Sequence, residues 1–214
     1  MATAAVHGHG DGHEAAQGTL HVTDETIYKE TRDMRLLGFV LFLCSDVVLF
    51  SSFIFAYLYL RGTIDVWPPM LDGKQLPRLD LPFAMVNSIV LFGSGVTMHF
   101  ALENWKHDKH KAFNGFMAAT IVLGVLFLCG QGYEYSHAQI GGWSGSIFGA
   151  SFFTLTGMHG FHVFAGVCYL AVLWWQTRTG IYDKDHYFGL TAGTLYWHFV
   201  DVIWVLLFFL FYLY

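Results

Sequence analysis

The chain has 214 residues, of which 55% are hydrophobic, 18% aromatic and only 13% charged. Charged residues make up about a quarter of an ordinary soluble domain, so this composition indicates an integral membrane protein. The net charge of -5 argues against a basic nucleic-acid-binding surface. Cys44, Cys129 and Cys168 lie in separate apolar segments without CxxC spacing, which argues against a disulfide framework or a thiolate metal site.

Residues 1–33 are expected to form a disordered cytoplasmic tail rich in histidine and glycine. The tail has neither the basic start nor the apolar stretch of a cleavable signal peptide. Histidine-rich tracts of this kind bind transition metals weakly, but a solvated tail is the simpler interpretation. The histidines concerned are His7, His9, His13 and His21.

Five apolar segments follow in residues 34–214, and each is long enough for a helix to cross a bilayer, which takes about 20 residues. The segments are too long and too uniformly apolar for the strands of a membrane barrel. We therefore expect an all-α, polytopic membrane protein with one domain, a bundle of five transmembrane helices. The expected helices are Arg35–Leu60, Pro82–Asn104, Phe113–Tyr135, Ile147–Trp175 and Leu190–Tyr214.

The lysine and arginine residues predict the orientation of these helices, because such residues concentrate in cytoplasmic segments. Eight of them fall in the tail and in the second and fourth connections, against three in the first connection. The N-terminus is therefore expected in the cytoplasm and the C-terminus outside. The eight are Lys29, Arg32, Arg35, Lys106, Lys109, Lys111, Arg178 and Lys184, and the three are Arg61, Lys74 and Arg78.

Polar residues recur at helical spacing inside the apolar segments. His159 and His162 are three residues apart, as are His198 and Asp201, so each pair lies on one helix face. Because a polar group in hydrocarbon is costly, these faces should point into the bundle. The other segments carry Asp46 in the first, Ser88, Gly95, His99 and Glu103 in the second, and Thr120, Gly124, Gln131 and Glu134 in the third.

Three interpretations of these polar residues remain open. Histidines on facing helices can ligate haem, whereas a carboxylate-bridged di-iron site needs two Glu-x-x-His repeats, which the chain lacks. A proton relay is the second interpretation, with His162 as a candidate partner of Asp46. The third is that the polar groups hydrogen-bond one another across the bundle.

Aromatic and basic residues near the expected helix ends are typical of anchors at the membrane surface. Arg61, Trp67 and Arg178 are of this kind. They are also candidates for binding lipid headgroups, together with His186 near the cytoplasmic end of the fifth helix.

Six motifs, in this order, resemble those of subunit III of the haem-copper oxidases, specifically the cytochrome c oxidase type. The resemblance runs from about Leu36 to Tyr214. The motifs are LFLCSDVVLFSSFIFAY, WPP (Trp67–Pro69), VNSIVLFGSGVTMHFAL, LGVLFLCGQGYEYSHA, GSIFGASFFTLTGMHGFHV and YWHFVDVIWVLLF.

The resemblance implies a chain with no metal, haem or copper of its own. Its partners would be subunits I and II, which carry the redox centres, reduce oxygen to water and pump protons, with a small subunit IV as a further candidate. Subunit III would bind phospholipid, pack beside the catalytic subunit, and support proton uptake and sustained turnover in a bacterial plasma membrane. The implied buried polar or proton-related residues are Asp46, Glu134, His159, His162, His198 and Asp201.

The chain departs from the family pattern at three points. The family often has Glu at the position of Asp46, and Asp is frequent in quinol oxidases, whereas the WPP loop favours cytochrome c oxidase. Gln176 stands where the family has a basic residue, with Arg178 two positions later. The first two helices of seven-helix members are missing, as in many bacterial members. The family's lipid-filled cleft would thus be incomplete within this chain.

The sequence thus predicts subunit III of an aa3-type cytochrome c oxidase. The alternatives within the family are subunit III of a quinol oxidase and the accessory protein of nitric oxide reductase. A stand-alone membrane haem or metal protein is the alternative of a different class.

Overall fold

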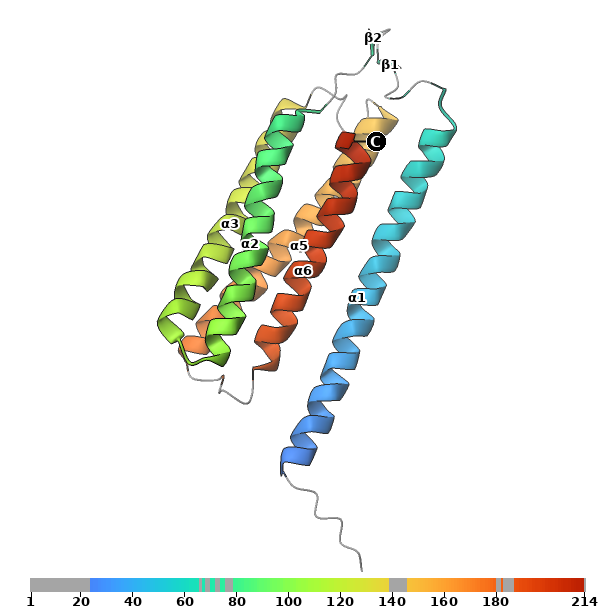
Figure 1. Ribbon diagram of the computed structural model, residues 1–214. Coiled ribbons are helices and arrows are strands. Elements are labelled where there is room, and N and C mark those ends of the chain that lie inside the picture. The colour runs from blue at the N-terminus through green and yellow to red at the C-terminus, as the bar shows by residue number, and fades with distance from the viewer. Residues whose placement is uncertain are drawn as a thin grey trace, which may run out of the picture.

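Long helices dominate the computed structural model, which describes residues 24–65, 67, 70–71, 74–75, 79–138, 146–179, 182 and 187–213 (Figure 1). A short antiparallel hairpin pairs Met70 with Gln75 and Leu71 with Lys74 between the first two helices. The elements are α1 (Asp24–Gly62), β1 (Met70–Leu71), β2 (Lys74–Gln75), α2 (Leu81–Lys106), α3 (His110–His137), α5 (Ile147–Arg178), α6 (Phe188–Phe208) and the π-helical turn η1 (Phe209–Leu213).

The five long helices are each long and apolar enough to cross a membrane, which confirms the all-α, five-helix prediction. The largest difference lies at the N-terminus. Helix α1 begins at Asp24 and not near Arg35, so residues 24–33 are helical although they were expected to belong to a disordered tail. The earlier part of that tail, with its four histidines, lies outside the described residues.

Local sequence signals explain where the helices begin and turn. The Asp80 carboxylate accepts a hydrogen bond from the backbone N–H of Phe83, and Pro82 occupies the first turn of α2. Ser146 caps α5 by accepting from the N–H of Gly149. The turn between α2 and α3 needs a left-handed residue, and Asp108, with φ of 57°, supplies it.

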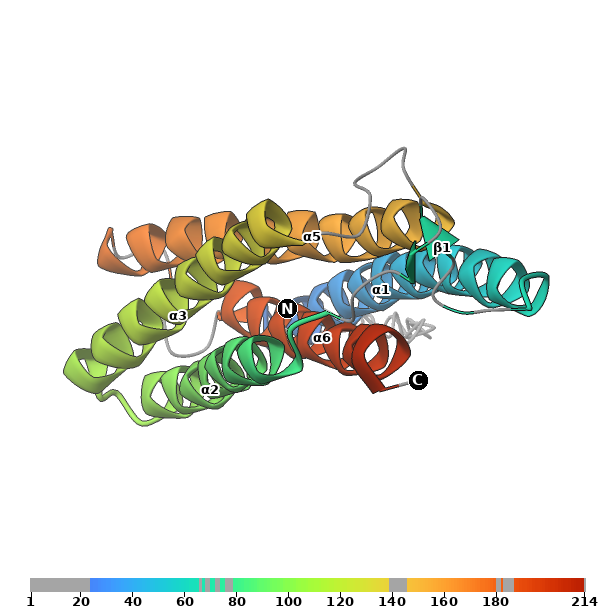
Figure 2. The same cartoon turned by 90° about the horizontal axis from the view of Figure 1, so that it is seen from above.

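Helices α2, α3, α5 and α6 form a closed four-helix bundle, in which α2 contacts α3 and α6, and α5 contacts the same two helices. Helix α1 lies outside this ring, along α5 and α6 (Figures 1 and 2). We call the end with β1 and β2 the hairpin end, and the end where α1 begins the tail end.

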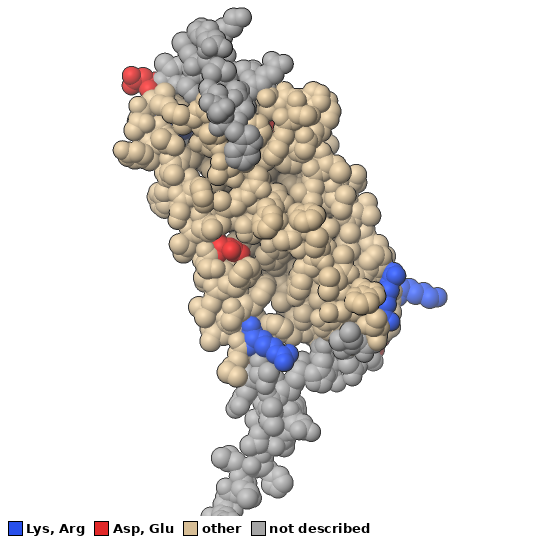
Figure 3. Space-filling view, turned by 180° about the vertical axis from the view of Figure 1, so that it is seen from behind, with Lys and Arg blue, Asp and Glu red and all other residues tan. Residues whose placement is uncertain are grey.

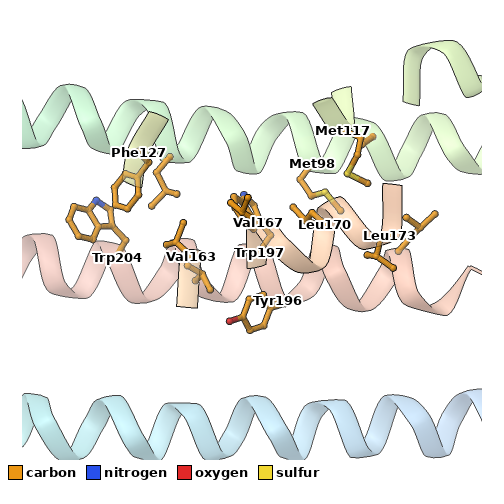
Figure 4. Packing of buried hydrophobic residues seen from close by; sticks show 14 of the residues in the cluster. Met98, Met117, Phe127, Val163, Val167, Leu170, Leu173, Tyr196, Trp197 and Trp204 are labelled. Atoms are coloured by element: carbon orange, nitrogen blue, oxygen red, sulfur yellow. The ribbon is translucent and has the colours of Figure 1, made fainter. Parts of the chain in front are cut away.

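Two tryptophans of α6 occupy the centre of the bundle. Trp197 and Trp204 are each 1% exposed and point toward α2, α3 and α5 (Figure 4). Their indole N–H groups donate to the hydroxyls of Ser94 (3.0 Å) and Ser88 (2.8 Å) on α2. These bonds satisfy the polar atom of each buried indole and fix the register of α6 against α2.

Helix α1 meets the bundle through a narrow stripe. Its buried hydrophobic residues are Leu43, Phe50 and Tyr57, which are seven residues apart. Most other large side chains along α1 are exposed, with Phe55 at 70%. The spacing of seven is the repeat of a helix that packs along a single seam.

Candidate functional site

The joint between α1 and α5 holds a carboxylate and an imidazole. Asp46 Oδ1 lies 3.9 Å from Nε2 of His162, and both side chains are largely buried. The other ring nitrogen of His162, Nδ1, lies 2.8 Å from the Met158 carbonyl oxygen. Because a carbonyl oxygen can only accept, Nδ1 carries a hydrogen and the neutral ring has its lone pair on Nε2.

A hydrogen bond between Asp46 and Nε2 of His162 would need one proton between the two groups. The gap of 3.9 Å is too long for a hydrogen bond, which spans about 2.9 Å. Closing it requires a proton on Nε2 or on the carboxyl group. The two side chains therefore lie close together, as expected, at the contact that attaches α1 to the bundle, without a direct hydrogen bond.

His159 lies one turn from His162 but in a different environment. Its side chain is 0% exposed, stacks on Trp204 with ring centroids 5.0 Å apart, and meets Phe127 edge-on. Within the described part of the chain neither ring nitrogen has a hydrogen-bond partner. Of the three interpretations, hydrogen bonding across the bundle does not describe His159 in this structure, because aromatic rings surround it.

Glu134 belongs to a polar network at the hairpin end. The Tyr212 hydroxyl donates to Oε1 of Glu134 at 2.6 Å, and the Gln131 amide donates to Oε2 at 3.3 Å. The Tyr135 hydroxyl lies 2.7 Å from the hydroxyl of Thr156 on α5, which is a hydrogen-bond distance. The hydrogen bond between Glu134 and Tyr212 thus ties the turn η1 to α3. The apolar sequence around Tyr212 gave no sign of this contact.

The pair on α6 lies at the surface of the bundle beside α2. His198 Nδ1 is 3.7 Å from Oδ2 of Asp201, and the two side chains are 43% and 13% exposed. A side chain on Gly95 of α2 would collide with the Asp201 carboxylate, which fills the space there. The His99 ring lies 6.5 Å from that of His198. His198 is thus half-exposed, although its helix face was expected to be buried.

The remaining polar positions are mostly inside the bundle, as their helical spacing predicted. Among the residues that the structure describes, no three His, Cys, Asp or Glu side chains form a group that could hold a metal ion. The buried residues of this kind are Ser88, Gly95, Thr120, Gly124 and Gln131.

The candidate lipid-binding residues are divided between the two ends of the bundle. Arg61, in the last turn of α1, and Trp67 lie at the hairpin end, where the Trp67 ring packs edge-on against Tyr57 and Phe148. Arg178 lies at the tail end, with its guanidinium group 4.1 Å from the centre of the Trp174 ring. His186 lies outside the described residues.

Gln176, which departs from the family pattern, has a partner in the connection between α5 and α6. The Tyr182 hydroxyl donates to Gln176 Oε1 at 3.1 Å. Burial raises the pKa of the Tyr182 phenol, so the hydroxyl keeps its proton at neutral pH. The amide thus holds the connection against α5.

The fold and these contacts define a polytopic helical membrane protein, in which a four-helix bundle carries a fifth helix along a seam that contains Asp46 and His162. A family model described as "Cytochrome c oxidase subunit III" matches residues 16–214. The chain belongs to the cytochrome c oxidase subunit III family.

Relatives named cytochrome c oxidase subunit 3 match most of the chain. The protein of Synechocystis sp. is 38% identical over 182 residues, which cover 85% of this chain and 76% of the relative. That of Thermostichus vulcanus is 35% identical over 199 residues, covering 92% and 95%. That of the tick Rhipicephalus sanguineus is 38% identical over 180 residues, covering 80% and 67%.

Membership of this family confirms the resemblance on which the sequence prediction relied. The chain is a multi-pass membrane subunit of cytochrome c oxidase, and a non-catalytic one. The family lacks haem and copper centres, and a subunit III implies subunits I and II as partners.

Proposed function

We propose that the chain is subunit III of a proton-pumping aa3-type cytochrome c oxidase in a bacterial plasma membrane, where oxygen is reduced to water. It stabilises the catalytic subunit, retains phospholipid and supports proton uptake. The observation that carries this proposal is the Asp46–His162 pair at the joint of α1 and α5. The names of the relatives favour cytochrome c over quinol as the electron donor, and the two cyanobacterial relatives favour a prokaryotic membrane.

The pair supports this role through its position. Helix α1 is attached by a narrow stripe, and the Asp46–His162 contact lies between Leu43 and Phe50 of that stripe. Because the contact lies within this stripe, replacing either side chain should change how firmly α1 is held. Lipids beside α1 and the neighbouring catalytic subunit would respond to that attachment.

Phospholipid headgroups would bind at both ends of the bundle. Arg61 and Trp67 serve the hairpin end, and Arg178 serves the tail end together with His186. The guanidinium group of Arg178 stacks on Trp174. A phosphate group is the natural ligand for such a guanidinium group at the membrane surface.

The charge distribution supports a cytoplasmic tail end. The described basic side chains at that end are Arg35, Lys106, Lys109, Lys111 and Arg178, against Arg61 at the hairpin end. Figure 3 shows Lys and Arg side chains at the tail end of the face opposite to that of Figure 1. The N-terminus would then lie in the cytoplasm and the C-terminus outside.

The variant Asp46→Asn tests the proposal in the purified oxidase complex. We expect haem spectra and the initial rate of oxygen reduction close to wild type, because the family to which the chain belongs lacks haem and copper centres. Bound phospholipid and the number of turnovers before inactivation should fall. Asp46→Glu is the matched control, since it keeps the carboxyl group, and should restore both properties.

Two results would contradict the proposal. Immediate loss of oxygen reduction in an assembled Asp46→Asn complex would place this residue in the catalytic path. Stoichiometric haem or iron on the isolated chain would indicate a stand-alone haem or metal protein. A complex that oxidises quinol and not cytochrome c would instead identify subunit III of a quinol oxidase, for which the Asp at position 46 is the supporting feature.

A further inference from the structure

The contact between α1 and α5 brings two hydrogen-bond acceptors face to face in the middle of the membrane span. Asp46 lies near the middle of the span Asp33–Gly62, and His162 near the middle of the span Ile147–Arg178. Nδ1 of His162 donates to the Met158 carbonyl oxygen at 2.8 Å. The neutral ring therefore presents the lone pair of Nε2 to the Asp46 carboxylate, whose oxygens also accept.

Two facing acceptors need a hydrogen-bond donor between them. Oδ1 of Asp46 and Nε2 of His162 are 3.9 Å apart, which is longer than a direct hydrogen bond of about 2.9 Å. Oδ2 of the same carboxylate is enclosed and has no hydrogen-bond partner within the described residues. A water molecule supplies two O–H donors. Two bonds of about 2.8 Å span the observed distance when they meet at roughly a right angle, close to the angle between the two O–H bonds of water.

The surrounding side chains enclose this position on most sides. Leu43 and Phe50 are buried and lie about one turn before and after Asp46, and the Phe50 ring is 5.0 Å from that of His162. Tyr196 lies between α6 and α1 (Figure 4), and its hydroxyl donates to the His162 carbonyl oxygen at 3.1 Å. The Asp46 and His162 side chains remain 13% and 14% exposed. An enclosed position with two polar partners is where proteins hold a buried water.

We propose that the joint of α1 and α5 binds one water molecule, which donates to Asp46 Oδ1 and to His162 Nε2 and so completes the attachment of α1 at mid-span. The inference goes beyond the proposed function, because it assigns a ligand to the contact itself. The water gives both acceptors a donor without moving either helix. A direct bond would instead need a proton on one of the two groups and a shorter distance between them.

Electron cryomicroscopy of the assembled oxidase, at a resolution that shows ordered waters elsewhere in the complex, tests this site. We expect a density peak within about 3.2 Å of both Asp46 Oδ1 and His162 Nε2. The proposal is overturned if no peak is present there. It is also overturned if the two atoms lie within direct hydrogen-bond distance, or if a lipid chain contacts the carboxylate.

The variant His162→Phe tests the two partners of the water. The phenyl ring keeps the shape of the side chain but lacks Nε2, so the water loses one of its two partners and the density peak should disappear. Ser52→Ala is the matched control on α1, because the Ser52 side chain is exposed and donates to the Val48 carbonyl oxygen at 2.8 Å. This variant should keep the peak. An unchanged peak in His162→Phe would contradict the proposal.

Infrared spectroscopy of the same complexes provides a second measurement. The O–H stretching band of a bound water shifts when the complex is transferred into water labelled with the heavy oxygen isotope. We expect an isotope-sensitive band in the difference spectrum between wild type and His162→Phe, and none in that between wild type and Ser52→Ala. Absence of the band from the first spectrum would overturn the water site and leave the expected effects of Asp46→Asn in place.

Discussion

His159 shows what a histidine does when its surroundings are entirely aromatic. The ring lies between Trp204 and Phe127 and behaves as one more aromatic side chain of the core. A buried polar atom without a partner destabilises the fold, so a phenyl ring of similar size should serve as well or better. In this structure His159 therefore packs as part of the aromatic core.

We predict that His159→Phe changes the free energy of unfolding by less than about 1.5 kcal/mol, because a swap of similar volume is tolerated in a core. His159→Ala leaves a cavity and should destabilise the subunit by about 2–5 kcal/mol. Thermal dissociation of the purified complex measures both. Loss of oxidase activity in a stably assembled His159→Phe complex would show that the imidazole has a chemical role.

The contact between Tyr212 and Glu134 supports a second prediction. Tyr212→Phe removes the hydroxyl that donates to the buried carboxyl group and should destabilise the subunit by about 1–3 kcal/mol. Tyr133→Phe is the control, since Tyr133 is 56% exposed. In a double-mutant cycle, Tyr212→Phe should have little further effect once Glu134 is replaced by Gln, and full additivity would contradict the contact.

Residue spacing predicted which helix face a polar residue occupies better than it predicted which residue that side chain contacts. The three-residue spacing of His159 and His162 correctly put both toward the bundle, and Asp46 was correctly matched to His162. Residues three apart still differ in direction around the helix axis. One imidazole can therefore lie near a carboxylate while the other contacts only aromatic rings. Tyr212 could not be found from spacing, because its partner lies on α3 and its own segment reads as uniformly apolar.

At the scale of elements, two glycines determine how closely the helices approach Trp197. A side chain at Gly124 of α3 would come 2.9 Å from the Trp197 ring, and one at Gly166 of α5 would come equally close from another side. The indole is thus enclosed by backbone on both helices. That Gly124 and Gly166 share Trp197 as a neighbour is visible only in the structure.

We predict that Gly124→Ala and Gly166→Ala each destabilise the subunit by about 1–3 kcal/mol, because the added methyl groups overpack the core around Trp197. Gly160→Ala on α5 is the matched control, since nothing lies within 4 Å of the added carbon. It should be neutral or stabilising by up to about 1 kcal/mol, from the better helix propensity of alanine. Thermal dissociation of the complex distinguishes the two cases.

The helices themselves were predictable because hydropathy and length almost define a membrane-spanning segment. The start of α1 was not, since residues 24–33 carry charged side chains that give no apolar signal. Helix propensity and continuity with an existing helix extend α1 toward Asp24. The packing of α1 outside the ring of the other four helices could not be predicted either. Apolar residues occur on all sides of α1, so the sequence does not show which side contacts the bundle.

At the scale of the whole molecule, the basic residues predict an orientation that reporter fusions can measure. Alkaline phosphatase fused after Tyr214 should be active, and the same enzyme inserted in the α2–α3 turn at Asp108 should be inactive. A cytoplasmic fluorescent reporter should give the opposite pattern at the two sites. Equal activity of the phosphatase at both positions would rule out the five-span topology.

The narrow contact between α1 and the bundle affects how cooperatively the chain unfolds. Among the described side chains of α1, Leu43, Phe50 and Tyr57 are the buried hydrophobic ones, with Phe39 and Ile54 partly buried beside them, whereas the other four helices enclose one another. The chain should therefore unfold in two units, with α1 detaching at a lower free energy than the remaining bundle. Asp46 lies in this seam, so its contact with His162 is lost whenever α1 detaches.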